Sequence, residues 1–119
     1  MAINVKNSLL SFYLVLVSFP IMSSDTIVPN EEILEKPFPL PYERINVSKD
    51  DLRNFIDKTI NNNKQPVIIF GANWCPDCRI LSAVLELPTV KKYMNENFET
   101  LYIDLGRYDI NMSLMKYFD

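Results

Sequence analysis

The sequence predicts an α/β fold in which parallel strands are joined by helices. Two short runs, residues 67–70 and 101–105, are almost continuously apolar, as strands covered on both faces are. Segments with apolar residues at helical spacing stand before, between and after these runs. The expected order is strand, helix, strand, helix, strand, helix, with right-handed crossovers joining the strands.

Length and composition narrow the class of protein. A chain of 119 residues is at most one domain, and a hydrophobic content of 48% suits an ordinary globular core. The net charge of −3, with no basic cluster, argues against a nucleic-acid partner. A structural zinc site needs four ligands, whereas this chain has 2 cysteines and no histidine.

The predicted domain begins with a strand and a helix. Residues 43–47 are the candidate for the first strand. Ser48 is expected to cap the helix that follows, because Asp51 three residues later completes a variant of the capping box. The apolar stripe of this helix consists of Leu52, Phe55, Ile56, Thr59 and Ile60. The asparagines at 61–63 end it.

The rest of the domain alternates helices and strands. In chain order we expect a strand at 67–70, a helix from Cys78 towards Leu87, a helical segment at 90–97, a strand at 101–105 and a last helix at 111–118. Pro88 should break or kink the second helix, since proline lacks a backbone donor. Gly106 marks the turn out of the third strand.

A Cys-x-x-Cys pair, Cys75 and Cys78, stands between a predicted strand and a predicted helix, which is typical of a redox motif. Two intervening residues make one helical turn, so both sulfurs are expected on one side of the helix start, within reach of a disulfide. Pro76 suits the first helical position, where a missing N–H costs nothing. Free N–H groups and the helix dipole favour a thiolate there. We therefore predict Cys75 as the attacking sulfur and Cys78 as the resolving sulfur.

Two charged neighbours of the cysteines act in opposite directions. Arg79 would stabilise a thiolate, whereas Asp77 opposes it at Cys75. An acid in the first turn nevertheless suits the helix dipole. Which of the two effects is larger stays open.

Two other interpretations of the cysteine pair remain. A static disulfide between Cys75 and Cys78 would close a very short loop and remove little entropy from the unfolded chain. In the second interpretation, the two residues are reduced cysteines of the core. Pro76 and Asp77 between them, however, indicate the start of a helix rather than its interior.

Two stretches resemble a known family. The string Phe-Gly-Ala-Asn-Trp-Cys-Pro-Asp-Cys-Arg at 70–79, after an apolar run, resembles the thioredoxin superfamily. Together with Tyr-Ile-Asp-Leu-Gly-Arg-Tyr-Asp-Ile-Asn at 102–111, it is similar to exported bacterial thioredoxin-family proteins. The resemblance runs from about Tyr42 to the end of the chain.

The resemblance implies a thioredoxin-like, three-layer α/β fold and assigns roles by position. Cys75 resembles the family nucleophile, Cys78 its resolving partner, and Trp74 the aromatic residue beside the active site, with plain packing as the alternative for Trp74. The family pattern continues with a cis-proline loop, two antiparallel strands and a closing helix, and the chain is expected to end before them. Val67–Phe70 would then be an exposed apolar edge through which self-association is expected.

The N-terminal third is expected to lie outside the domain. Residues 1–24 have the pattern of a signal peptide or an uncleaved anchor, because Lys6 precedes a stretch without charge that ends near Ser24. Residues 25–42 contain four prolines, Pro29, Pro37, Pro39 and Pro41, and are predicted to be an extended linker. The domain is then residues 43–119.

Thiol–disulfide exchange in an exported, periplasmic protein is the function that these features predict. Its substrates would be protein disulfides or dithiols, with electrons passing to or from a partner redox protein and with no bound cofactor or metal. The direction of exchange stays open. The alternatives are a non-catalytic thioredoxin-like binding module, which delivers copper or haem or docks on a membrane complex, and an inactive truncated remnant.

Overall fold

The computed structural model describes residues 27–118. The predicted signal peptide or anchor, residues 1–24, lies outside the described residues. In chain order the elements are α1 (Lys49–Asn61), β1 (Gln65–Gly71), α2 (Pro76–Leu85), α3 (Pro88–Asn97), β2 (Phe98–Asp104), α4 (Met112–Met115) and the 3-10 helix η1 (Lys116–Phe118). Over this part of the chain, no helix combines the length and the apolar character that a membrane span requires.

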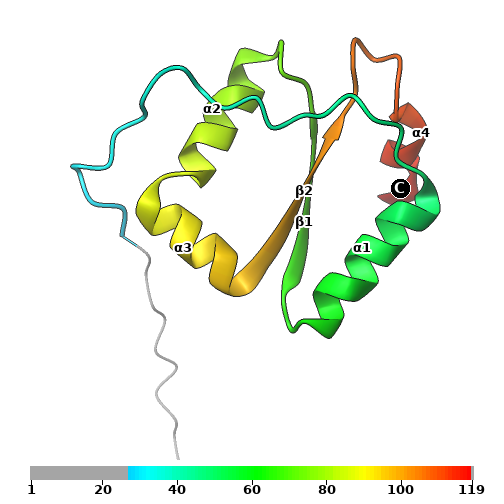
Figure 1. Ribbon diagram of the computed structural model, residues 1–119, viewed down its shortest axis with the longest axis horizontal. Coiled ribbons are helices and arrows are strands. Elements are labelled where there is room, and N and C mark those ends of the chain that lie inside the picture. Colours follow the sequence, from blue (N-terminus) through cyan, green and yellow to red (C-terminus); the bar gives the residue numbers. More distant parts are fainter. Residues whose placement is uncertain (1–26, 119) are drawn as a thin grey trace, which may run out of the picture.

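A pair of parallel strands forms the middle layer of the molecule (Figure 1). The pairing runs from Gln65 opposite Phe98 to Gly71 opposite Asp104. The connection through α2 and α3 lies on one side of the sheet, and α1 and α4 lie on the other (Figure 1). Because the strands are parallel, their carboxyl ends lie at the same end of the sheet, where the loops that follow them come together.

The core lies between the sheet and the layer of α1 and α4. Leu52, Ile103 and Leu114 are buried there, with 0%, 0% and 1% of their surface exposed. Residues two apart on a strand share a face, so β1 and β2 both contribute to this side. The partly buried apolar side chains around the three are Val47, Ile56, Ile68, Phe70, Leu101 and Tyr117.

The predicted strand at residues 43–47 is wrong, because this segment is irregular. It belongs to a strap, residues 38–47, that crosses over the carboxyl ends of the strands (Figure 1). Side chains take the place of a neighbouring strand: the Tyr42 N–H donates to Asn73 Oδ1 at 3.1 Å, and the Val47 N–H donates to Asn111 Oδ1 at 2.9 Å. The sheet within residues 27–118 therefore has two strands and not three.

The predicted helices are present, with one change at the end of the chain. The Ser48 hydroxyl accepts the Asp51 N–H at 3.0 Å and the Asp51 carboxylate accepts the Ser48 N–H at 3.0 Å, which confirms the capping box of α1. Pro88 separates α2 from α3, as expected. The single helix predicted at 111–118 is instead divided into α4 and η1. Asn111 has a left-handed φ of 56° and does not cap α4, because its side chain binds the strap.

The proline-rich segment contacts the domain along its length. The Glu32 carboxylate accepts a hydrogen bond from the Thr89 N–H at 3.0 Å. Further on, the Arg79 guanidinium donates to the Phe38 carbonyl at 2.8 Å and to the Pro39 carbonyl at 3.3 Å. The division of the chain at residues 24 and 42 stays a prediction.

One edge of β1 has no strand beside it within residues 27–118, because β1 pairs with β2 alone. Backbone groups along such an edge are available to another chain. Self-association through Val67–Phe70 stays a prediction.

Truncating the central core side chain should destabilise the fold strongly. Leu52→Ala is expected to lower the free energy of unfolding by about 3 kcal/mol, because it removes buried methyl groups and leaves a cavity. Ile60→Ala is the matched control on the same helix, since the Ile60 side chain is 56% exposed and should change stability by no more than about 0.5 kcal/mol. Urea unfolding measures both. Equal losses in the two variants would contradict the assigned core.

Candidate functional site

The two cysteines lie at the start of α2, just beyond the carboxyl end of β1. Cys75 is the N-cap residue in an extended conformation, with φ −82° and ψ 113°, and Pro76 occupies the first turn. The Cys75 Sγ accepts the Cys78 backbone N–H at 3.4 Å. Both cysteines are free thiols and partly exposed. The structure thus places Cys75 at the end of α2 where the free backbone N–H groups lie.

Trp74 forms a wall of the site and is joined to the loop after β2. Its Nε1–H donates to the Gly106 carbonyl at 2.6 Å. Its ring meets the Tyr108 ring edge to face at a centroid distance of 6.0 Å, and the Arg107 guanidinium lies over it at 5.8 Å. A cavity of about 130 Å³ opens between this wall and the sulfurs of Cys75 and Cys78.

The two charged neighbours have different surroundings. Asp77 is exposed in the first turn of α2, where an acid suits the helix dipole. The hydrogen bonds of Arg79 go to two carbonyls of the strap, those of Phe38 and Pro39. Arg79 therefore anchors the strap, and its expected effect on the thiolate stays a prediction.

Tyr42 is a site residue that the sequence did not indicate. It stands at the end of the predicted linker, yet only 4% of it is exposed. A methyl group built on Gly71 would lie 2.5 Å from the Tyr42 Oη and 3.0 Å from the Cys78 Sγ, so these two atoms are close neighbours across the glycine. The segment also contains Phe38 and several aliphatic residues, so nothing in the sequence singled Tyr42 out.

Two asparagines hold the strap over the site. Asn73 pairs with the backbone of Tyr42 in both directions, accepting its N–H at 3.1 Å and donating to its carbonyl at 2.7 Å. Asn111 accepts the Val47 N–H and donates to the carbonyls of Ile45 and Asp104, both at 2.8 Å. The segments that follow β1 and β2 are therefore tied to the same strap.

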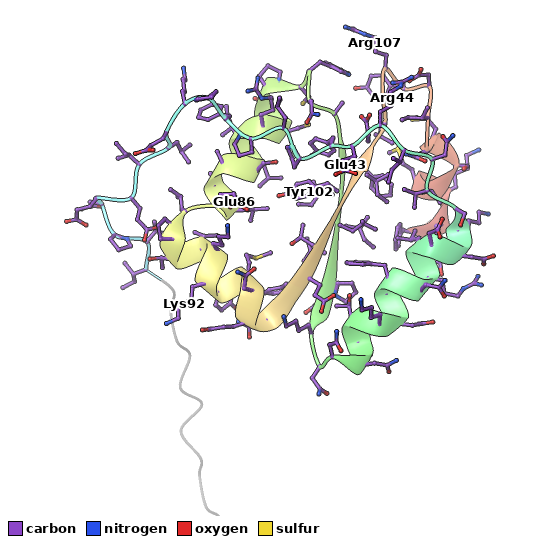
Figure 2. All side chains as sticks on the ribbon, in the orientation of Figure 1. Glu43, Arg44, Glu86, Lys92, Tyr102 and Arg107 are labelled. Carbon is purple, nitrogen blue, oxygen red and sulfur yellow. The ribbon has the colours of Figure 1, made fainter. Side chains whose placement is uncertain are left out.

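An ion pair adds to this attachment on the outside. Arg44 and Asp109 are 2.8 Å apart and both exposed. Figure 2 shows Arg44 and Arg107 at this end of the molecule, and Tyr102 projecting from β2 on the side where α2 lies. Such an exposed pair contributes little to stability, so the asparagine hydrogen bonds are the main attachment.

Burial changes the acidity of two groups in the site. It raises the pKa of Tyr42 above its usual range, and the nearby Cys78 adds to this effect. Burial also raises the pKa of the Cys78 thiol; its hydrogen bond with Cys75 acts in the same direction, and Tyr42 acts in the opposite direction. At neutral pH both groups are therefore protonated in the resting, reduced state.

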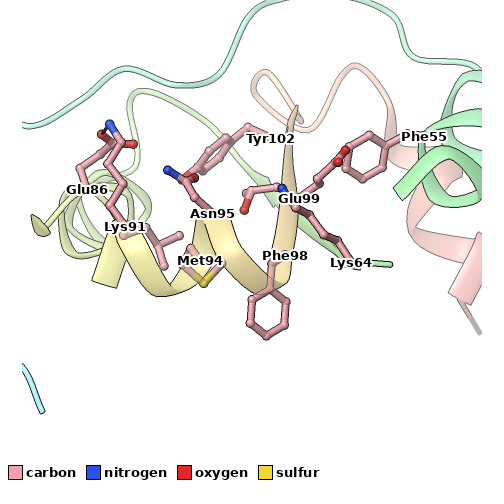
Figure 3. Close-up of a pocket in the computed structure, with 11 residues that line it drawn as sticks. Phe55, Lys64, Glu86, Lys91, Met94, Asn95, Phe98, Glu99 and Tyr102 are labelled. Carbon is pink, nitrogen blue, oxygen red and sulfur yellow. Dashed lines mark hydrogen bonds and ion pairs between the residues drawn. The ribbon is translucent and has the colours of Figure 1, made fainter. Parts of the chain in front are cut away.

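A second hollow, of about 490 Å³, lies apart from the cysteines, with walls from α3, β2 and α1 (Figure 3). Met94, Phe98 and Phe55 contribute to it. The acid there, Glu99, already accepts hydrogen bonds from Thr59 and Asn62, at 3.2 Å and 3.0 Å. No group of three metal-ligating side chains is found within residues 27–118. The cysteine site is thus the place where the described residues bring reactive groups together.

Comparison with solved structures finds a disulphide isomerase from Xylella fastidiosa Temecula1, with a TM-score of 0.60 and 29% sequence identity. The likeness covers 66% of this chain. The fold is thioredoxin-like. The predicted α/β class with helices on both sides of a parallel sheet is confirmed, although its first expected strand is replaced by the strap. No family model matches the sequence, and no curated protein matches it.

The chain spans 60% of the length of that disulphide isomerase. A shared fold carries chemistry only where the site is also present. The likeness in fold therefore does not by itself assign roles to Cys75, Cys78 and Trp74. Such roles have to be argued from the geometry of the site described above.

Loss of the Asn111 side chain should loosen the strap. Asn111→Ala removes three hydrogen bonds and is expected to lower the free energy of unfolding by about 1–3 kcal/mol. Asn111→Gly is the matched control for the backbone, because glycine tolerates the left-handed φ of 56° and loses only the hydrogen bonds. Hydrogen exchange at the Val47 amide, together with urea unfolding, measures the effect. A Val47 amide equally protected in all three proteins would contradict the assignment.

Proposed function

We propose that this chain carries out thiol–disulfide exchange with protein substrates, with Cys75 as the attacking sulfur and Cys78 as the resolving sulfur. The observation that carries the proposal is the position of Cys75 at the start of α2, where its Sγ accepts the Cys78 N–H at 3.4 Å. The likeness to a disulphide isomerase supports this class of chemistry. The sequence resemblance to exported bacterial thioredoxin-family proteins agrees with it.

The first step in the reducing direction is attack by the Cys75 thiolate on a substrate disulfide. A bond forms between the Cys75 sulfur and one substrate sulfur, and the substrate disulfide breaks. The other substrate sulfur leaves as a thiolate and takes a proton from water. The product is a mixed disulfide at the mouth of the 130 Å³ cavity beside Trp74.

The second step releases the substrate. Cys78 loses its proton to water and attacks the Cys75 sulfur; the Cys75–Cys78 bond forms and the bond to the substrate breaks. The second substrate sulfur leaves as a thiolate and is protonated. Two electrons have then passed to the substrate, and a partner dithiol returns the chain to its reduced form. The reverse sequence oxidises a dithiol substrate.

The rim of the site suits an extended peptide around a disulfide. Trp74 and Tyr108 are 48% and 66% exposed beside the cysteines, which offers apolar and aromatic surface without closing the cavity. Arg107 lies next to them. We infer protein or peptide disulfides and dithiols as the substrate class, since nothing in the rim encloses a small molecule.

We also propose that the chain acts outside the cytoplasm, in the periplasm. Support comes from the sequence: a stretch without charge follows Lys6 and continues to Ser24, as in a signal peptide or membrane anchor.

Single cysteine variants separate the two steps. Cys78→Ser is expected to accumulate a mixed disulfide with a disulfide-bonded peptide, because the resolving sulfur is missing. Cys75→Ser is expected to reduce the peptide no faster than buffer does. Mass spectrometry under non-reducing conditions and the release of peptide thiol measure both. A mixed disulfide through Cys78 rather than Cys75 would reverse the roles, and an inert but folded wild-type chain would favour a binding module.

Export should be visible as a change in location. The full chain produced in a bacterium is expected in the periplasmic or membrane fraction, whereas a variant with Leu9, Leu10 and Leu14 changed to Asp should stay in the cytoplasm, because charges break the apolar stretch. Fractionation with immunodetection measures this. Recovery of the wild-type chain in the cytoplasm would contradict the proposal.

A further inference from the structure

The hydroxyl of Tyr42 is a buried polar atom with no hydrogen-bond partner among the described residues. Buried hydroxyls nearly always have a hydrogen-bond partner, because a hydroxyl that loses its bonds to water and gains none in the protein is destabilising. An unpartnered hydroxyl beside a reactive sulfur therefore calls for an explanation. Its partner is expected to be a group that appears during the reaction.

The Tyr42 hydroxyl lies close to the Cys78 sulfur, the proposed resolving sulfur. The Tyr42 Oη and the Cys78 Sγ both lie within 3.0 Å of the point where a Gly71 side chain would begin. Gly71, at the end of β1, leaves the space between them open. Apart from the two chain neighbours of Gly71, the atoms nearest to that point belong to Tyr42 and Cys78.

The tyrosine is held in this position from several sides. Asn73, in the loop that leads to Cys75, bonds both backbone groups of Tyr42. The Tyr102 ring of β2 meets the Tyr42 ring edge to face, with centroids 5.3 Å apart. The strap residue is thus fixed against the loop and the sheet, and its hydroxyl is pre-positioned.

We propose that the Tyr42 hydroxyl donates a hydrogen bond to the Cys78 thiolate as this thiolate forms, and so speeds the release of substrate from the mixed disulfide. The inference rests on the proposed exchange function and adds to it a residue outside the Cys-x-x-Cys motif. A hydrogen bond to a charged acceptor is stronger than one to a neutral thiol, so the interaction is greatest in the state that attacks.

The hydroxyl acts as a donor and not as a base. Burial raises the pKa of Tyr42 above its usual range, so the phenol keeps its proton throughout. The Cys78 proton goes to water, the Cys78 sulfur bonds to the Cys75 sulfur, and the substrate leaves as a thiolate that is then protonated. Tyr42 gains and loses no atom or electron in this sequence.

Few other groups compete for this role. Cys75, the N-cap of α2, and the Ala72 backbone also lie against Cys78, and the Tyr102 ring packs against the Tyr42 ring. Asp77 is exposed and Arg79 is bonded to the Phe38 and Pro39 carbonyls. Tyr42 is thus the side chain from outside α2 that reaches the resolving sulfur.

Tyr42→Phe tests the proposal, because it removes the hydroxyl and keeps the ring. Since that hydroxyl has no hydrogen-bond partner among the described residues, the variant should fold with an unchanged unfolding midpoint. The full reduced chain is mixed with one equivalent of 5,5′-dithiobis(2-nitrobenzoate) in a stopped-flow instrument. The first equivalent of coloured thiolate reports attack by Cys75, and the second reports resolution by Cys78.

In Tyr42→Phe the first phase should be unchanged and the second about tenfold slower at neutral pH, the size expected for one hydrogen bond to a charged group. The difference should vanish at high pH, where Cys78 ionises without help. Tyr93→Phe, in which the changed residue is 42% exposed on α3, is the matched control and should match the wild type. An unchanged second phase in Tyr42→Phe overturns the proposal, whereas a wild-type chain without a first phase overturns the exchange function itself.

A second measurement needs no change at Tyr42. In Cys75→Ser, the thiolate absorbance reports ionisation of Cys78 as the pH rises. The tyrosine absorption band should shift with the same midpoint, because a phenol that begins to donate to a thiolate changes its spectrum. A tyrosine band that does not respond to ionisation of Cys78 would overturn the proposal even if Tyr42→Phe failed to fold.

Discussion

The parallel pairing of β1 and β2 is the constraint on which the rest of the structure depends. Parallel strands end at the same edge, so the loop that carries Cys75 and the loop around Gly106 are brought together. The pairing continues past the strands, since the Leu105 N–H donates to the Gly71 carbonyl at 2.8 Å. The bond from Trp74 to the Gly106 carbonyl then fixes the wall of the site. The hydrogen bonds to the carbonyls of Gly71 and Gly106 thus fix how the cysteine loop lies against the loop after β2.

The strap covers the carboxyl end of the sheet and so encloses part of the cysteine site. Without it, Cys78 would lie under an open sheet end; with it, Tyr42 covers Gly71 and the Cys78 sulfur. Asparagine is well suited to this attachment because one side chain both donates and accepts. Asn73 and Asn111 each use both groups to bind the backbone of the strap. Side chains of the strap add to this attachment, since Tyr42 packs against Tyr102 and Val47 packs against the core.

Local signals in the sequence predicted the elements that local interactions form. The start of α1 depends on Ser48 and Asp51, three residues apart, and the start of α2 depends on Cys75 and Pro76. These contacts are visible in the sequence because their partners are adjacent. The same holds for the break at Pro88.

What the sequence could not predict depends on partners far along the chain. Residues 43–47 were the candidate for a first strand, but the Val47 N–H bonds Asn111, 64 residues away, and this contact decides the path of the backbone. Tyr42 was assigned to the linker for the same reason: its partner Asn73 is 31 residues away. The cysteine pair was predicted from its spacing and its place between a predicted strand and helix, whereas the residue that covers Cys78 required the folded chain.

The position of Trp74 has a consequence for how the molecule can be observed. It is the chain's 1 tryptophan, and it precedes Cys75 directly while its indole N–H is bonded to the Gly106 carbonyl. Its emission therefore comes from a single place, where the cysteine loop meets the loop after β2. The protein therefore carries its own fluorescent label at the mouth of the cavity beside the two cysteines, and changes there can be followed without attaching a dye.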